Sequence, residues 1–190
     1  MSADAVTTLA YNRSTIFSLD GEGFDIKKIT EFNYYEDILK QAVTADMKIA
    51  SSFSYVNQLP IRGGEKVELN ISTSFGEVKF EGDNALYVYK VSGQKTSRMV
   101  EEFTLHLTTL ESFSNQSTRC MKKYNFQGIG EHVEDILKNT LQTKKDIKIE
   151  PTANSYTFIG NSKKPFYTLT WLGSKAISQV AEKSGVSGEG

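Results

Sequence analysis

In the stretch AVTADMKIA, residues 42–50, apolar and polar side chains alternate from Val43 to Ile49. Successive side chains of a β-strand point to opposite faces of the sheet, so this pattern predicts a strand with one buried and one solvated face. The residues expected on the buried face are Val43, Ala45, Met47 and Ile49.

Similar stretches extend this sheet along the first half of the chain. VELNIST, residues 67–73, repeats the alternation, and the short SFG segment then turns the chain into EVKF, residues 77–80. Two alternating runs joined by a Gly-containing turn are typical of a β-hairpin. We expect Val78 and Phe80 to point inward.

Three more stretches complete a predicted set of about six strands. NALYVYKV, residues 84–91, is apolar on both faces, which indicates a central or covered strand. FTLHLTT, residues 103–109, returns to clean alternation. FDIKKITEF, residues 24–32, starts in one phase and resumes in the other, so a bulge is expected near Lys27 and Lys28.

The period changes after about residue 111. In IGEHVEDILKNTL, residues 129–141, apolar residues recur at helical spacing, with acidic residues early and a lysine late, which suits the helix dipole. A second helix is predicted to begin at Pro165 and to end near Gly185. Between them, DIKIEP (146–151) and SYTFIG (155–160) are short strand candidates.

This order of elements predicts an α+β fold. Strands followed by helices argue against a β-α-β alternation, and six antiparallel strands in one layer must close or be covered, because open edges invite aggregation. We therefore expect an antiparallel β-barrel over residues 1–111 and a smaller α/β extension with two amphipathic helices over residues 112–190. The Gly/Ser-rich end, SGVSGEG, reads as a flexible tail.

Composition narrows the possible function. The 190 residues carry 22 Lys and Arg against 23 Asp and Glu, so the overall charge attracts neither nucleic acid nor an anionic membrane. A single cysteine, Cys120, excludes an internal disulfide and a cysteine-based zinc site. The sequence shows no leader pattern and no apolar run long enough to span a bilayer, so we expect a soluble product made in the cytoplasm without a membrane anchor.

The residues usually found in catalytic sites are few. Glu36 and Asp37 are adjacent, and adjacent side chains of an extended chain point apart, so the pair is interpreted as a solvated turn. His106 in a strand and His132 in a helix form no recognised motif, and GIG at residues 128–130 does not extend to GxGxxG. We predict no catalytic residues, no metal and no cofactor.

Several segments, taken in order, resemble the baseplate hub proteins of contractile-tailed bacteriophages. They begin with a YED-I corner and an LPI-GGE segment within residues 32–73, followed by YVYKVSGQ, FTLHLTTLES and GIGEHVEDILKN. The last is IEPTANSYTFIGNSKKPFYTLTWLGSKAIS, with the family's P-F-x-x-x-x-W-L-x-S-x-A spacing. The resemblance runs from about residue 25 to residue 180 and rests on the collinear order of these segments.

The resemblance implies a tail-tube-like barrel and a structural role in the virion tail baseplate. The implied assembly is a ring of copies of this chain, a trimer or a hexamer, around a channel that joins the tail tube to the central spike. Tape-measure and baseplate wedge proteins are further implied partners; DNA would transit the channel without sequence-specific recognition. We expect the subunit interface to include Tyr34, Tyr35, Glu36, Asp37, Tyr87 and Tyr89.

Two alternatives stay open on the sequence alone. The first is a small β-barrel module that binds a ligand in its interior, and the second, a hydrolase of unrecognised type. The family also continues past the W-L-x-S-x-A helix into a second tube-like domain, whereas this sequence stops at SGVSGEG. The choice between a trimer and a hexamer depends on whether another chain supplies that domain.

Overall fold

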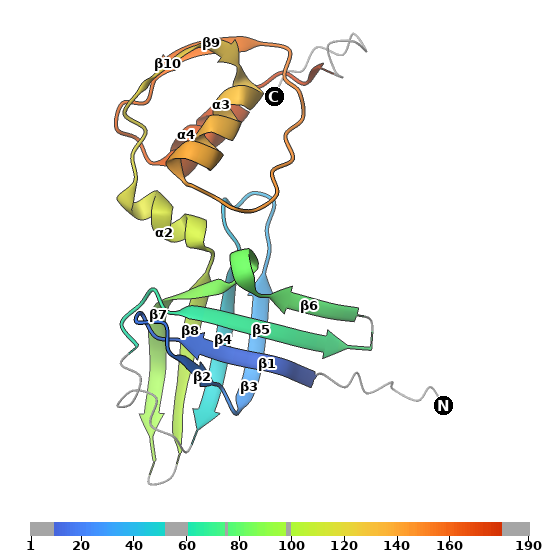
Figure 1. Ribbon diagram of the computed structural model, residues 1–190, viewed down its shortest axis with the longest axis vertical. Coiled ribbons are helices and arrows are strands. Elements are labelled where there is room, and N and C mark those ends of the chain that lie inside the picture. The colour runs from blue at the N-terminus through green and yellow to red at the C-terminus, as the bar shows by residue number, and fades with distance from the viewer. Residues whose placement is uncertain (1–9, 52–60, 75, 98–99, 180–190) are drawn as a thin grey trace. The chain divides into compact units, whose positions relative to one another are not determined.

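The computed structural model describes residues 10–51, 61–74, 76–97 and 100–179 (Figure 1). The chain separates into two compact units, Met1–Leu110 and Glu111–Gly190. The first unit is mostly antiparallel sheet, and the second combines short helices with a two-stranded sheet, which confirms the α+β class. The predicted Gly/Ser tail lies outside the described residues.

The first unit contains eight described strands in one antiparallel sheet. Their order is β2-β1-β5-β7-β8-β4-β3, with β6 paired to β5. The strands are β1 (Ala10–Phe17), β2 (Gly23–Asp25), β3 (Ile29–Tyr35), β4 (Thr44–Ser51), β5 (Lys66–Thr73), β6 (Gly76–Phe80), β7 (Leu86–Thr96) and β8 (Glu101–Thr108). A short 3-10 turn, Gly82–Asn84, links β6 to β7.

All the long strands contribute to one apolar core. The alternation predicted for residues 42–50 is confirmed, because Ala45, Met47 and Ile49 are each at most 2% exposed, whereas Val43 is only half-buried. The inward residues of β5 and β8 are buried in the same cluster. Phe80 is also buried, but Val78 is 49% exposed because β6 is an edge strand at the rim of the core.

The strand β1 was missed from the sequence because its middle is polar. Asn12, Arg13, Ser14 and Thr15 stand in a row; Ile16 is the strand's buried core residue, and Tyr11 packs against the core only partly buried. The Arg13 guanidinium lies 3.1 Å from the carboxylate of Glu68, which itself is buried. The strand is therefore held by pairing with β5 and by this ion pair, and local hydrophobicity gives little sign of it.

Both ends of the strand ladder lie on one bent segment, residues 23–35. The expected change of phase is present as a break between β2 and β3. At this break the Ile26 amide donates to the Ser14 carbonyl of β1 (2.7 Å), and the Ala50 amide of β4 donates to the Lys28 carbonyl (3.1 Å). The bent segment therefore contacts both β1 and β4, although β2 and β3 themselves form no ladder in the described part of the chain.

The described part of the second unit contains two strands and four helical segments. Its elements are α2 (Leu110–Ser117), β9 (Lys123–Gly128), α3 (Ile129–Asp135), a π-helical continuation (Ile136–Thr140), β10 (Ser155–Ile159) and α4 (Pro165–Gly173). The predicted helix over residues 129–141 is confirmed as α3 and its continuation. The helix from Pro165 is confirmed at its start but ends at Gly173, and residues 146–151 form no strand.

The core of the second unit is largely aromatic. The rings of Tyr124 and Phe158 stack with centroids 4.3 Å apart, and His132 meets both rings edge-on. Trp171 of α4 packs against Phe158 at 5.4 Å. These contacts hold β9, β10, α3 and α4 together around a small cluster that also buries Ile129, Ile136 and Leu172.

Glu111 near the start of the second unit links stability to pH. Burial alone would raise the pKa of Glu111, but hydrogen bonds from Thr143 Oγ1 (2.6 Å) and Lys145 Nζ (2.9 Å) outweigh it, so the pKa is lowered. A lowered folded pKa stabilises the fold above the unfolded value of about 4.3, and this stabilisation is lost as the pH falls through the folded pKa. We expect Glu111→Gln to cost about 1 kcal/mol of unfolding free energy at pH 7 and much less at pH 3.

Urea unfolding at both pH values, followed by Trp171 fluorescence, measures this difference. Glu131→Gln is the matched control, because Glu131 is exposed on α3. Equal losses for Glu111→Gln at pH 7 and pH 3 would contradict the assigned linkage.

Candidate assembly surface

Tyr35 and Tyr87 lie on the same, outer face of the sheet. Tyr35 of β3 pairs with Thr44 of β4, Thr44 pairs with Thr108 of β8, and Thr108 pairs with Tyr87 of β7. Directly paired residues share a face, so these four side chains form one row across four strands. The row is spaced by about 5 Å per strand and therefore spans roughly 14 Å.

Tyr34 points to the opposite face. It pairs with Ala45, which is fully buried, and its ring lies 5.2 Å from the ring of Phe80. Burial raises the pKa of Tyr34, and the nearby Glu36 carboxylate adds to this. Tyr34 remains 40% exposed, so it lies at the rim of the core rather than on the outer face.

Tyr89 is placed outward by an irregularity in β7. The register with β8 shifts between Val88 and Lys90, so Tyr89 and Lys90 both lie opposite His106. Tyr89 is 47% exposed, and its ring lies 6.0 Å from the His106 ring. The same shift turns Val91 toward the core, whereas strict alternation along β7 would place Val91 on the side of Tyr89.

Glu36 and Asp37 lie in an exposed turn, as interpreted from the sequence. The Leu39 amide donates to Asp37 Oδ1 (2.9 Å), and the Lys40 amide donates to the Asp37 carbonyl (2.9 Å). An aspartate that accepts a bond from the backbone two residues ahead forms an Asx-turn. Asp37 therefore shapes the corner between β3 and β4.

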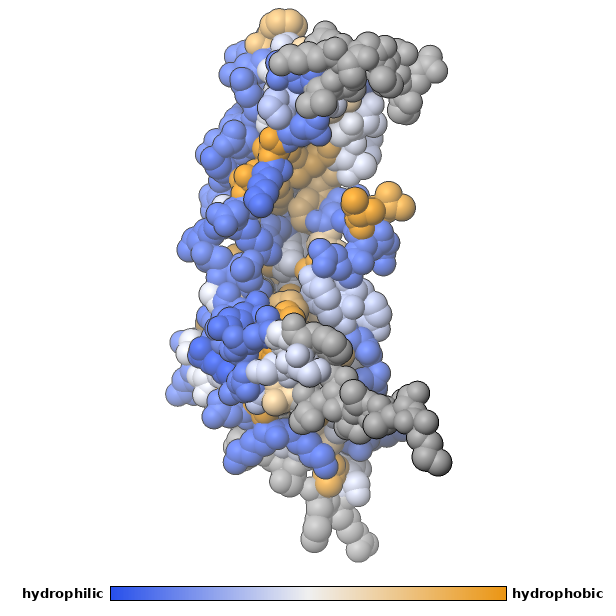
Figure 2. Space-filling model, turned by 90° about the vertical axis from the view of Figure 1, so that its right-hand side faces the viewer, coloured by the Kyte–Doolittle hydropathy of each residue, from blue (hydrophilic) through white to orange (hydrophobic). Residues whose placement is uncertain are grey.

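The same corner exposes two aliphatic residues that were not predicted as site residues. Ile38 is 99% exposed and Leu39 is 86% exposed. On the face that Figure 2 shows, hydrophobic residues form small, separate patches on a mostly hydrophilic surface. The sequence offered one sign of this exposed pair: two aliphatic residues follow two acidic residues directly and lie outside the alternating pattern of the strands.

The two histidines have different surroundings. His132 is 1% exposed, and its Nε2 lies 2.9 Å from the Tyr156 carbonyl, so it is a satisfied core residue. His106 lies on the outer face of β8, with Asp46 at one ring nitrogen and Ser92 at the other. Across the described ranges, no three His, Cys, Asp or Glu side chains gather as a metal site.

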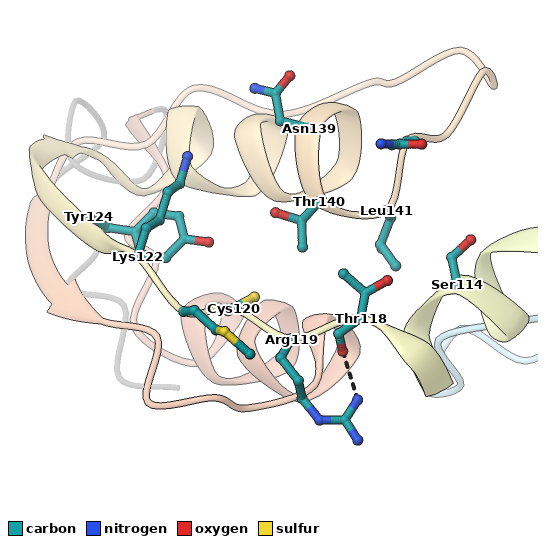
Figure 3. Close-up of a pocket in the computed structure, with 11 residues that line it drawn as sticks. Ser114, Thr118, Arg119, Cys120, Lys122, Tyr124, Asn139, Thr140 and Leu141 are labelled. Carbon is teal, nitrogen blue, oxygen red and sulfur yellow. Dashed lines mark hydrogen bonds between the residues drawn. The ribbon is translucent and has the colours of Figure 1, made fainter.

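The second unit has a polar cavity of about 460 Å³ beside the end of the π-helical segment (Figure 3). Its lining includes Tyr124, Thr140 and the buried Cys120. Burial raises the pKa of Tyr124, and the Cys120 thiol adds to this. The Arg119 guanidinium turns away from Tyr124 and Thr140 and donates to the Thr118 carbonyl (2.7 Å).

In the part of the chain that the structure describes, no helix combines the length and hydrophobicity needed to cross a bilayer.

Comparison with known proteins gives matches at the level of the fold. No protein-family model matches the sequence, and no curated protein matches it. The 43 kDa tail protein of prophage MuSo2 from Shewanella oneidensis has a TM-score of 0.58 and 11% identity, over 88% of this chain and 48% of its own. A tail protein from Neisseria meningitidis MC58 has a TM-score of 0.53 and 13% identity, over 86% and 44%.

A third solved structure comes from a secretion system. The E. coli c3393 protein is described as a type VI secretion component with structural similarity to the T4 bacteriophage tail proteins gp27 and gp5. It has a TM-score of 0.54 and 10% identity, over 90% of this chain and 41% of its own. This chain therefore spans less than half the length of each of the three proteins. It shares its fold with these two tail proteins and with this type VI secretion component.

Proposed function

We propose that this protein is a structural subunit of a phage tail baseplate hub, and that it has no enzymatic role in the assembled tail. The observation that carries the proposal is the fold likeness to tail proteins, which extends over 86–90% of the chain and includes both compact units. The order of sequence segments supports the same family independently. In this role the protein belongs to the virion tail and is made in the host cytoplasm.

The first unit is proposed to act as a closed, tube-like barrel. The bent segment between β2 and β3 connects the two ends of the ladder through its bonds to β1 and β4. Elsewhere the edge strands β3 and β6 meet through side chains, because Phe80 lies 5.8 Å from Phe32 and 5.2 Å from Tyr34 by ring centroids. Closure of this kind protects the edges of a sheet against unwanted pairing.

The assembled form is proposed to be a ring, a trimer or a hexamer, between tail tube and central spike, with tape-measure and wedge proteins as neighbours. Tyr35, Tyr87 and Tyr89 share the outer face, and tyrosine is enriched at protein interfaces. A second contact is proposed at the corner that contains Tyr34, Glu36 and Asp37. It would be made through the neighbouring exposed residues Ile38 and Leu39. The interior of the first unit is filled by packed side chains, which favours a structural role over a ligand-binding barrel.

The corner between β3 and β4 provides the test of this assembly. Replacing both Ile38 and Leu39 with serine removes exposed apolar surface and touches no described core residue. We expect the double variant to keep its fold and to shift ring formation to at least tenfold higher protein concentration, since burying two aliphatic side chains contributes about 1.5 kcal/mol or more each.

Native mass spectrometry over a concentration series, alone and with tail-tube and spike proteins, measures the ring. Tyr87→Ser/Tyr89→Ser tests the outer face in the same assay, and Lys123→Ser, an exposed change in β9, is the control. A wild-type chain that stays monomeric with and without these partners would contradict the hub proposal.

A further inference from the structure

Three polar side chains on the outer face of the first unit form a continuous hydrogen-bonded chain. Asp46 Oδ1 lies 2.6 Å from His106 Nδ1, and His106 Nε2 lies 2.7 Å from Ser92 Oγ. The residues come from the adjacent strands β4, β8 and β7. A carboxylate at one imidazole nitrogen and a serine hydroxyl at the other is the arrangement that activates serine nucleophiles.

The direction of the protons follows from the chemistry of the three groups. An ionised Asp46 carboxylate only accepts hydrogen bonds, so His106 Nδ1 carries a proton and donates it. In the neutral ring Nε2 is then an acceptor, and the Ser92 hydroxyl donates to it. The imidazole is therefore held in the tautomer that can remove the hydroxyl proton.

A bulge in β7 is what brings Ser92 to this face. Leu86 and Val88 point into the core, so strict alternation would also place residue 92 inward. The register shift between Val88 and Lys90 inserts one residue and reverses the phase, which turns Val91 to the core and Ser92 outward. Bulges that re-aim a side chain are a recurrent feature beside functional sites.

A second irregularity follows directly after the serine. Ser92 pairs with Thr104, and Lys95 pairs with Glu102. Two residues of β7, Gly93 and Gln94, therefore lie opposite a single residue of β8. Gly93 has a φ of +67°, which favours glycine and is typical of a bulge.

The cluster is accessible from solvent. The side chains of His106 and Asp46 are 20% and 34% exposed, and Ser92 is half-buried. The half-exposed Tyr89 ring stands beside the imidazole and offers a surface for a small apolar group. Because the Ser92 hydroxyl is half-buried among neighbouring side chains, a substrate has to be unhindered around its reacting carbon.

We propose that Ser92 is an activated nucleophile that accepts acyl groups from small esters. Ser92 Oγ attacks the ester carbonyl while its proton passes to His106 Nε2. The ester C–O bond then breaks, and the alcohol leaves with that proton. Water, deprotonated by the same nitrogen, cleaves the acyl-serine to release the acid and restore the serine.

This activity is independent of the hub role and belongs to the free subunit. The site shares the outer face with Tyr35 and Tyr87, so a neighbouring subunit seated there would cover it. The labelling and hydrolysis experiments described below therefore use the unassembled full chain at low concentration. Failure to form rings and failure to react are separate results.

Reaction with an alkyl fluorophosphonate tests the nucleophile. The Ser92 Oγ–P bond forms, the P–F bond breaks, fluoride leaves, and His106 takes the proton. We expect peptide mass spectrometry to find the label at Ser92, and the labelling rate to fall at least ~100-fold in His106→Gln. Ser92→Ala should lose the label and the hydrolysis of p-nitrophenyl acetate, whereas Ser174→Ala, at an exposed serine of the second unit, should keep both.

The proposal is overturned if Ser92 of the native wild-type chain labels no faster than Ser174, a comparison made within one protein that requires no variant to fold. It is also overturned if His106→Gln, with an unchanged circular dichroism spectrum, labels at the wild-type rate.

Asp46 acts through His106 and is a positioning residue. We expect the ¹⁵N chemical shifts of the neutral His106 ring to report a proton at Nδ1 in the wild type. Asp46→Asn should shift the tautomer toward Nε2–H and slow labelling at least ~10-fold. Unchanged ring shifts together with unchanged labelling would remove Asp46 from the site.

Discussion

Gly160→Ala is expected to unfold the second unit or to destabilise it by about 3 kcal/mol or more. A Cβ at this position would lie 2.3 Å from the Cys120 carbonyl oxygen, 2.6 Å from its carbon and 2.8 Å from the Cys120 Cβ. Two of these three atoms are backbone, so no rotation of a flexible side chain can relieve the contact.

The surrounding hydrogen bonds leave little room for the backbone to move. The Gly160 amide donates to the Lys122 carbonyl (3.1 Å), and the Ser162 amide donates to the Cys120 carbonyl (3.0 Å). The turn between them holds Asn161 at a φ of 48°, already an unusual conformation for a residue with a side chain. Shifting Cys120 would disturb both bonds and its buried thiol.

Trp171 is the chain's single tryptophan and lies in the aromatic core of this unit, so its fluorescence reports the unfolding of the second unit specifically. Gly173→Ala is the matched control. A Cβ at Gly173 would meet nothing within 4 Å, and alanine favours a helix over glycine by up to about 1 kcal/mol. Equal urea midpoints for the two variants would contradict the close packing of Gly160 against Cys120.

Leu105→Ala is expected to destabilise the first unit by about 2–5 kcal/mol. Leu105 is fully buried and pairs with Met47 on one side and Val91 on the other, so its removal leaves a cavity in the middle of the core. The sheet around it is continuous, which limits how far neighbouring side chains can collapse into the space.

Leu39→Ala deletes the same atoms at a position that is 86% exposed, and its unfolding free energy is expected to change by less than about 0.5 kcal/mol. Urea unfolding followed by the β-sheet circular dichroism signal compares the two leucine variants. A loss at Leu105 no greater than that at Leu39 would contradict the packing of the core. Because Leu39 belongs to the proposed subunit contact, Leu39→Ala is expected to weaken assembly while the unfolding free energy stays nearly unchanged.

The sequence predicted the elements whose residues carry their own pattern. Strands β4, β5 and β8 alternate strictly, and the helix over residues 129–141 has an apolar stripe, so local periodicity suffices for all four. Pro165 marked a helix start because its fixed φ and missing amide suit the first turn. The end of that helix at Gly173 depends on the turn that follows, which periodicity does not report.

Other features depend on partners that periodicity cannot reveal. The polar strand β1 exists because β5 supplies a ladder and Glu68 supplies a counter-charge. Residues 146–151 show the converse, since they alternate but have no ladder in the structure. The cluster of Asp46, Ser92 and His106 requires the register of three strands and a bulge, and none of these is encoded in neighbouring residues.

The bent segment between β2 and β3 has a consequence for how the first unit can open. A terminal strand of an ordinary sheet can fray alone, because only one ladder is lost. Here β2 and β3 are successive parts of one segment whose bonds reach β1 through Ile26 and β4 through Lys28. We expect that detaching one end of this segment also loosens the other end. The strands β2 and β3 would then separate from the sheet together, in a single, larger fluctuation.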